Sequence, residues 1–342
     1  MSAQKKLRSF LSSYSFGKDE CRLVADSRAV KPGDIFIAVD GLSSRGVDFI
    51  PQAISCGAAA VIVDVDYKTT FAEGATPVLF VDDLSRNLGQ LAAEFYGHPS
   101  NQLLMFAITG TNGKTTVADL ILQIGRCLQV NVASIGTLGF QSDSKNVTTG
   151  MTTPEVTTLN DLLAQAVEQG SEWLALEVSS HGLDLGRVNG VVFDVAILTN
   201  LSRDHLDFHA DMHAYKAAKA KLFEWPNLKA KVLNIDDAFG CELRDIHRSS
   251  CVTYSLESPE ADVYCLQWAL DNRGISADIV TPWGPTELSL PLLGKFNLYN
   301  ALAALAALCQ MGQSLAVVIE ALSQVQTVPG RLEVVGNENP LV

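Results

Sequence analysis

The pattern of apolar and polar positions divides the first hundred residues into short strand-like runs and one clear helical segment. The runs DIFIAV, AAVIVD and VLFV are bounded by polar and turn-forming residues, as strands are. From Leu84 to Tyr96 the apolar residues recur at helical spacing, which predicts a helix. This alternation is typical of α/β layers. The breaker at Gly97-His98-Pro99-Ser100 predicts a domain boundary near residue 100.

A second set of apolar runs follows this boundary: LLMFAITG, WLALEVSS, DVAILTNL and KVLNI. They are nearly continuous instead of alternating, which is typical of parallel strands buried on both faces. From Cys251 to Pro291 the pattern changes to alternating β segments, and Asn297 to Met311 predicts an Ala/Leu-rich helix. We therefore predict an α/β protein with one domain over residues 1–100 and a larger, mostly parallel-sheet domain over residues 101–332.

Composition narrows the class of protein. Hydrophobic residues make up 47% of the 342 residues and charged residues 18%, which predicts a globular chain. The net charge of -13 disfavours nucleic acid and anionic lipid as partners but leaves room for a nucleotide in a local pocket. The seven cysteines form no C-x-x-C pair, and no apolar run reaches the roughly 18 residues of a membrane span. We expect a cytoplasmic monomer.

The strongest chemical signal is the segment that follows the apolar strand at LLMFAITG and opens a helical pattern. Its glycines let backbone amides approach phosphate oxygens, and the helix N-terminus favours negative charge. Lys114 adds a positive charge, and the hydroxyl of Thr115 is suited to magnesium. A phosphate-binding loop is therefore predicted from Gly110, Thr111, Asn112, Gly113, Lys114, Thr115 and Thr116. The usual spacing would place a glycine at position 108, where this chain has Ile108.

Two side chains near the ends of predicted strands are candidate metal ligands. Glu177 closes the strand WLALE, and His205 follows the strand DVAILTNL. Parallel strands bring such residues to the edge of the sheet where α/β proteins bind ligands, and hard cations prefer oxygen donors. Each residue, taken alone, is also a common polar loop residue. The alternating His205, Asp207 and His209 suggest a transition-metal site less strongly, because no further Cys or His cluster completes it.

The lysines of AYKAAKAKLF are predicted to face solvent, since they lie at helical spacing among small residues. They are Lys216, Lys219 and Lys221.

Taken together, these motifs resemble the Mur ligases, and among them the enzyme that adds the third residue of the peptidoglycan stem peptide. The resemblance rests on GTNGKTT, MTTPE, LEVSSHGL, TNLSRDHLDFH, YKAAKAKLF, GKFNLYNALAA and PGRLE, and in the N-terminal part on ADSR, PGDIFIAVDG and LSSRG. It implies a UDP-sugar-binding domain over residues 1–100 and a central ATP-binding domain over residues 101–332. Residues 333–342 would begin a linker to a C-terminal domain that this chain lacks.

The resemblance also implies roles for individual residues. Thr115 and Glu177 would bind one magnesium ion and His205 a second, and Lys219 would carry a carbamate that supplies an anionic oxygen ligand. Asn297, Asn300 and Arg331 would contact ATP. Contacts to the UDP-sugar would come from Ser27, Leu42, Ser43 and Ser44, and contacts to the muramoyl-peptide from Thr152, Thr153, Ser179 and Arg187. Family members often have glutamine two residues before this arginine, where this chain has Leu185.

The implied reaction activates the terminal carboxylate of UDP-N-acetylmuramoyl-L-alanyl-D-glutamate as an acyl phosphate, which the amine of an amino acid then displaces. Lys114, Glu177, His205 and Lys219 would be the catalytic residues, with ATP and Mg²⁺ as cofactors. The incoming residue would be meso-diaminopimelate or L-lysine. We expect this chain to bind the UDP-sugar and to ligate it poorly. A small-molecule kinase would explain only the phosphate loop, whereas a non-catalytic module that binds UDP-muramoyl-peptide and ATP remains an alternative.

Overall fold

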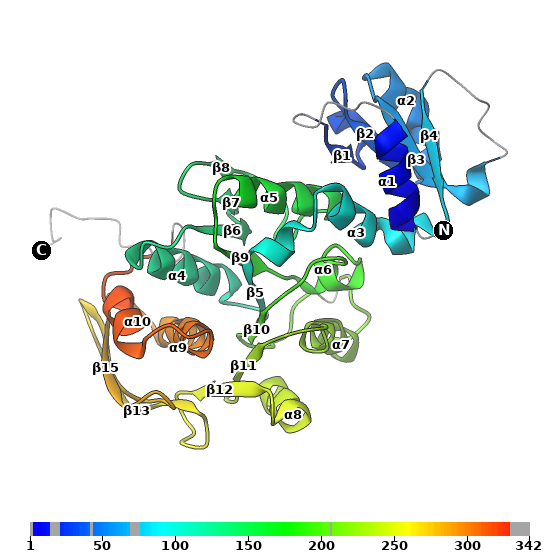
Figure 1. Cartoon of the computed structure of the whole chain (residues 1–342). Helices are drawn as coiled ribbons and strands as arrows, with labels where there is room; N and C mark the ends of the chain where they lie inside the picture. Colours follow the sequence, from blue (N-terminus) through cyan, green and yellow to red (C-terminus); the bar gives the residue numbers. More distant parts are fainter. Residues whose placement is uncertain (1–2, 14–20, 42–43, 69–75, 206, 329–342) are drawn as a thin grey trace, which may run out of the picture. The chain divides into compact units, whose positions relative to one another are not determined.

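The computed structural model describes residues 3–13, 21–41, 44–68, 76–205 and 207–328. The chain divides into two compact units, and we describe each by itself (Figure 1). Unit 1 comprises Met1–Gln102, Pro154–Glu168 and Gly186–Val191. Unit 2 comprises Leu103–Thr153, Gln169–Leu185 and Val192–Val342. Two segments of unit 1 therefore lie, in sequence, inside the range predicted for the second domain. The α/β class predicted from the sequence is confirmed.

Unit 1 is built on a parallel sheet with the strand order β1-β2-β3-β4. Its strands are β1 (Leu23–Val24), β2 (Ile35–Ala38), β3 (Ala60–Asp64) and β4 (Val78–Val81). Alternate residues of these strands point to opposite faces. Ile35 and Ile62 pack in a core with Leu7 of α1 (Ala3–Ser13) and Leu91 of α3 (Leu84–Phe95), whereas Phe36 belongs to a second core on the side of α2 (Ile50–Ser55). The three predicted N-terminal strands are confirmed.

The helices of unit 1 cover both faces of this sheet. They are α1 (Ala3–Ser13), α2 (Ile50–Ser55), α3 (Leu84–Phe95) and α5 (Val156–Glu168), with short 3₁₀ turns at Ser27–Ala29, Gly46–Phe49, Val65–Tyr67 and Pro99–Gln102. The helix predicted from Leu84 to Tyr96 ends one residue earlier, at Phe95. Helix α5 packs on α3 and β1 although it follows Thr153 in sequence.

Unit 2 contains, among its described residues, an eleven-stranded sheet with the order β15-β14-β13-β12-β11-β10-β5-β9-β6-β7-β8. Its strands are β5 (Leu104–Thr109), β6 (Val132–Gly136), β7 (Gly139–Gln141), β8 (Asn146–Val147), β9 (Trp173–Glu177), β10 (Val195–Leu198), β11 (Ala230–Asn234), β12 (Cys251–Ser255), β13 (Val263–Asp271), β14 (Gly274–Val280) and β15 (Thr286–Leu290). The central strands are parallel, as predicted, and antiparallel strands extend the sheet at both ends. Strand β6 and the antiparallel pair β7 and β8 were not predicted.

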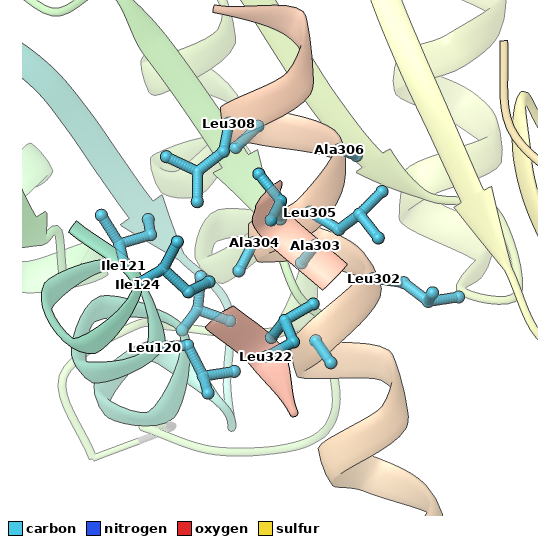
Figure 2. Close-up of a cluster of buried hydrophobic side chains, with 14 of the residues drawn as sticks. Leu120, Ile121, Ile124, Leu302, Ala303, Ala304, Leu305, Ala306, Leu308 and Leu322 are labelled. Atoms are coloured by element: carbon cyan, nitrogen blue, oxygen red, sulfur yellow. The ribbon is translucent and has the colours of Figure 1, made fainter. Parts of the chain in front are cut away.

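Two groups of helices enclose the parallel strands of unit 2 (Figure 1). One group is α4 (Lys114–Cys127), α9 (Lys295–Gln310) and α10 (Leu315–Leu322), and the other is α6 (Ser180–Asp184), α7 (Met212–Phe223) and α8 (Ala238–His247). Figure 2 shows side chains of α4, α9 and α10 meeting in one apolar cluster, which includes Ile121, Leu305 and Leu322. The helix predicted from Asn297 to Met311 is α9. No described helix is long and apolar enough to cross a membrane.

The strand order places the phosphate loop at the centre of the parallel strands. Strand β5, which ends at the loop, lies between β9 and β10. Because all three strands are parallel, their carboxyl ends lie at one edge of the sheet. Glu177 is the last residue of β9, and the segment that contains His205 follows β10. This topology brings candidate residues from separate parts of the sequence to the same edge.

Candidate nucleotide and metal site

The phosphate loop runs from the end of β5 to the start of α4 and needs glycine at two positions. Gly110 has a φ of 149°, and a Cβ atom there would lie 1.8 Å from Thr199 Oγ1. Gly113 has a φ of 87°, and a Cβ atom there would lie 2.4 Å from Asn300 Oδ1. Both positions combine a backbone that disfavours side chains with a close neighbour. The shape of the loop therefore requires glycine at positions 110 and 113.

Residues after β10 hold the loop from one side. Asn200 accepts hydrogen bonds from two successive loop amides, Thr111 N to its carbonyl at 2.9 Å and Asn112 N to its Oδ1 at 3.0 Å. Thr199 Oγ1 donates to the carbonyl of Asn112 at 2.6 Å. Within the loop, Lys114 Nζ donates to the carbonyls of Gly110 at 2.9 Å and Thr111 at 3.0 Å. The Lys114 side chain therefore lies over the phosphate loop, to which it is predicted to add a positive charge.

Glu177 is almost fully buried at the end of β9, and Thr137 fixes its carboxylate. Thr137 donates its backbone N–H to Oε1 at 2.9 Å and its hydroxyl to Oε2 at 3.2 Å. Thr115, the first-turn residue of α4, lines the same small pocket as Glu177. Asp119, one turn further along α4, also lines that pocket, and burial raises the pKa of its carboxyl group. This pocket thus presents carboxylate and hydroxyl oxygens, the donors that a magnesium ion prefers.

Lys219 does not face solvent, so the prediction made from helical spacing is wrong for this residue. Its exposed fraction is 1%, and its Nζ donates to the carbonyl of Gly110 at 3.0 Å. Burial is the main cause that lowers the pKa of the Lys219 amine to about 7, and the charge of Lys114 acts in the same direction. Lys216 and Lys221 behave as predicted, since they form ion pairs with Glu242 and Asp184 near the surface.

His205 lies in a tight turn between β10 and α7. Its φ is 53°, and its carbonyl accepts hydrogen bonds from Phe208 N at 3.2 Å and His209 N at 3.0 Å. Its half-exposed imidazole meets the ring of His181 edge to face, with centroids 5.0 Å apart. His209 is buried, and its Nδ1 lies 3.3 Å from Asp184 Oδ2. Among the described residues no group of three or more His, Cys, Asp or Glu side chains is arranged to hold a metal ion.

The predicted nucleotide contacts on α9 border the loop. Asn297 and Asn300 are both buried, and Asn300 Nδ2 donates to Asn297 Oδ1 at 3.3 Å. Asn297 Nδ2 donates to the carbonyl of Leu293 at 2.8 Å. The close approach of Asn300 Oδ1 to Gly113 places this side chain beside the loop. Arg331 lies outside the described residues.

Three of the predicted substrate residues form a network around Glu177. Thr153 Oγ1 donates to the Glu177 carbonyl at 2.8 Å and accepts from Ser179 N at 2.9 Å. Ser179 caps α6, since its hydroxyl accepts from Gly182 N at 3.0 Å. Thr152 Oγ1 lies 3.1 Å from Thr137 Oγ1. These hydroxyls therefore adjoin the candidate metal pocket.

The remaining predicted substrate residues belong to unit 1. Ser27 is buried and donates its hydroxyl to Gln52 Oε1 at 2.8 Å, whereas Ser44 is exposed. Arg187 forms an ion pair with Glu155, with 2.8 Å between Nη2 and Oε1. Leu42 and Ser43 lie outside the described residues.

The structure also brings residues into the site that sequence reasoning did not identify. Thr137 orients Glu177, while Thr199 and Asn200 hold the loop. Tyr215 places its hydroxyl 3.1 Å from Thr111 Oγ1. Tyr215 lies four residues before Lys219, and that helical spacing is the one sequence signal that pairs it with the site.

Known proteins are similar to this chain in sequence and in fold. The model of the Mur ligase middle domain matches residues 108–308, and the model described as the Mur ligase family catalytic domain matches residues 22–96. The chain is 43% identical over 322 residues to UDP-N-acetylmuramoyl-L-alanyl-D-glutamate–2,6-diaminopimelate ligase of Ectopseudomonas mendocina, covering 94% of this chain and 66% of that protein. Its identity to the ligase of the same name from Chromobacterium violaceum is 43%, with the same coverage.

A solved structure of a UDP-N-acetylmuramoyl-L-alanyl-D-glutamate–2,6-diaminopimelate ligase superposes with a TM-score of 0.78 at 32% identity. The match covers 93% of this chain and 65% of that one. The chain thus spans about 66% of the length of the curated relatives that it matches.

Proposed function

Since the chain belongs to the Mur ligase family, we propose that it acts in peptidoglycan synthesis as an ATP-dependent acid–amino-acid ligase. Its substrate would be UDP-N-acetylmuramoyl-L-alanyl-D-glutamate, and its product would carry the third amino acid of the stem peptide. The names of the relatives favour 2,6-diaminopimelate over L-lysine as that residue. We place this reaction in the cytoplasm and expect a monomer.

The observation that carries the proposal is the position of Lys219. A buried amine with a pKa lowered to about 7 is uncharged in a large fraction of molecules at neutral pH, whereas an ordinary lysine is almost wholly charged, and only an uncharged amine adds to carbon dioxide to form a carbamate. The amine lies against Gly110 of the phosphate loop, where a carbamate would face the phosphates and their metal. A carbamate at this position would favour a ligase of this family over a phosphate loop that binds nucleotide alone.

The site residues fit ATP and magnesium. Gly110 to Thr116 would hold the phosphates, with Asn297, Asn300 and Arg331 toward the nucleotide. Thr115 and Glu177 share one pocket and would hold the first magnesium ion, with His205 and the modified Lys219 toward a second. Bound magnesium would offset the negative charge that gathers between the carboxylate and the transferred phosphoryl group. Lys114 adds a fixed positive charge on the same side.

The remaining residues would bind the UDP-muramoyl-dipeptide. Residues 1–100 would form the UDP-sugar-binding domain and residues 101–332 the ATP-binding domain, with a linker at 333–342. Contacts would come from Ser27, Leu42, Ser43, Ser44, Thr152, Thr153, Ser179 and Arg187. The hydroxyl network of Thr152, Thr153 and Ser179 around Glu177 supports this part, because it brings hydrogen-bonding groups beside the place where the carboxylate must be activated.

The test traps the acyl phosphate. The chain is incubated with ATP, Mg²⁺ and UDP-muramoyl-dipeptide in hydroxylamine, which converts an acyl phosphate to a stable hydroxamate, and ADP is measured in parallel. We expect both products to require the dipeptide and to be absent from a Lys114→Ala control. Binding of both substrates without hydroxamate would favour a non-catalytic binding module. A stable phosphate ester would favour a kinase, and failure to bind either substrate would overturn the proposal.

A further inference from the structure

Tyr215 is fully buried on α7 and contacts three groups of the candidate site. Its hydroxyl oxygen lies 3.1 Å from Thr111 Oγ1 in the phosphate loop. The amine of Lys219 lies over its ring, 4.5 Å from the centroid. The imidazole of His205 meets the ring at a centroid distance of 5.9 Å. No other side chain described in this site joins the loop, the buried lysine and the histidine.

These contacts hold the first half of the phosphate loop, at Gly110 and Thr111. Tyr215 and Lys219 are one helical turn apart, so both side chains leave the same face of α7. Tyr215 contacts the hydroxyl of Thr111, and Lys219 donates to the carbonyl of the preceding residue, Gly110. Two adjacent loop residues are therefore held by two side chains of one helix. The position of this part of the loop depends on both.

The hydrogen bonds of Thr111 assign a direction to the contact with Tyr215. Thr111 Oγ1 accepts from Ser202 N at 2.9 Å and donates to the Ser202 carbonyl at 3.2 Å. With its proton used in this way, the Thr111 oxygen still has a lone pair free. The Tyr215 hydroxyl then donates to that lone pair.

Neighbouring side chains also fix the ring of Tyr215. His209 is buried against it, with centroids 5.3 Å apart, and the Asp184 carboxylate lies beside His209 Nδ1. Lys221 Nζ in turn forms an ion pair with Asp184. Because the Lys219 amine lies over this ring and donates to the Gly110 carbonyl, a ring held in this orientation limits where the side chain can lie by packing and weak N–H contact, whatever its charge.

We propose that Tyr215 is a positioning residue of the nucleotide site, which sets the phosphate loop through Thr111 and the amine of Lys219 through its ring. This inference rests on the proposed function, because it assumes that a nucleotide occupies the loop. Tyr215 would touch neither the phosphates nor the metal. It would act by holding Thr111 and Lys219 in the positions from which these two residues reach the phosphates or the metal.

The experiment measures the affinity for Mg-ADP by isothermal titration in a double-mutant cycle. Tyr215→Phe keeps the ring and removes only the hydroxyl, and Thr111→Val removes its partner. We expect Tyr215→Phe to weaken binding about 2- to 12-fold, the effect of one hydrogen bond, and to cause no further loss in the Thr111→Val background. Tyr96→Phe is the matched control in unit 1, where the Tyr96 hydroxyl accepts from Leu23 N at 3.0 Å.

Each outcome decides between the possibilities. Unchanged affinity in Tyr215→Phe, while the wild-type chain binds Mg-ADP, overturns this inference and leaves the proposed function intact. An equal loss in Tyr96→Phe, or additive losses in the double variant, shows a general effect on stability and also overturns it. A wild-type chain that does not bind Mg-ADP overturns both the inference and the proposed function.

Discussion

The Lys219 amine is removed from water, and its pKa falls from an ordinary value of 10.5 to about 7, mainly because burial disfavours the charged form. Between these two values the unfolded chain binds the proton and the folded chain does not. The free energy of unfolding therefore rises with pH from about 7 to 10.5 on account of this group, and the contribution is constant below about pH 7.

This dependence is measurable by urea denaturation in buffer free of carbon dioxide. We expect the free energy of unfolding of the wild-type chain, minus that of Lys219→Met, to increase as the pH is raised from 7 to 9. Lys216→Met serves as the control, because Lys216 pairs with Glu242 near the surface. Parallel pH profiles of the wild type and Lys219→Met would show that the buried amine is not uncharged in the folded chain.

A second residue-scale prediction concerns Lys114. Lys114→Ala removes the loop's own cation, and charge-assisted hydrogen bonds contribute about 1.5 to 3 kcal/mol each. We expect ATP affinity to fall at least about 10- to 150-fold, as measured by isothermal titration, with the fold checked by circular dichroism. Unchanged affinity in a folded variant would remove the phosphate-loop assignment.

Individual residues were predictable from sequence where the backbone decides their place. Glu177 ends a strand, and the loop glycines occupy positions that exclude a side chain, so a strand pattern and a glycine motif suffice for them. Lys219 was not predictable from its helix alone, because the spacing of lysines in α7 does not reveal which face packs on the loop. Thr137 and Thr199 carry no signal, since a threonine's role depends on which carboxylate or carbonyl the fold brings near.

At the level of whole elements, continuous apolar runs identified four parallel strands of unit 2, β5, β9, β10 and β11, since burial on both faces leaves no polar positions. The parallel strand β6 was missed. The short strands β7 and β8 lack such a run, because they form a small antiparallel extension with one exposed end. Sequence order also could not show that α5 packs with the strands and helices of unit 1. That assignment depends on tertiary contacts, not on local pattern.

Helix α7 carries both Tyr215 and Lys219, and Asp211 fixes its start. The Asp211 side chain accepts a hydrogen bond from Ala214 N at 2.8 Å, which satisfies one otherwise unpaired amide of the first turn. We expect Asp211→Ala to lower the free energy of unfolding by about 0.5 to 2 kcal/mol, and Asp211→Asn, which keeps the cap, to retain most of it. Urea denaturation of the three chains measures both. Equal stability of Asp211→Ala and the wild type would contradict this role.

At the scale of the whole molecule, the proposed reaction needs residues that bind UDP-muramoyl-dipeptide, ATP and metal, and also residues that bind the incoming amino acid. The 342 residues span about 66% of the length of the relatives that they match, and every residue proposed here for UDP, muramoyl-peptide, ATP and metal lies among them. None of these residues is proposed to recognise the incoming amino acid. Holding two reactants together contributes about 7 to 11 kcal/mol to lowering a barrier, so amide formation depends on a site that holds the amine beside the acyl phosphate.

We therefore expect this span to bind UDP-muramoyl-dipeptide and to form the amide poorly. The measurement compares the 342-residue chain with a chimaera that joins it to the remaining third of a diaminopimelate ligase relative. Dipeptide affinity, from isothermal titration, should be similar in the two proteins, because the proposed contacts are common to both. Amide formation, followed by chromatography of the UDP-muramoyl product, should appear mainly in the chimaera. Full turnover by the 342-residue chain would show that the amine is bound within these residues, and the search for its site would then return to the surroundings of Glu177 and Ser179.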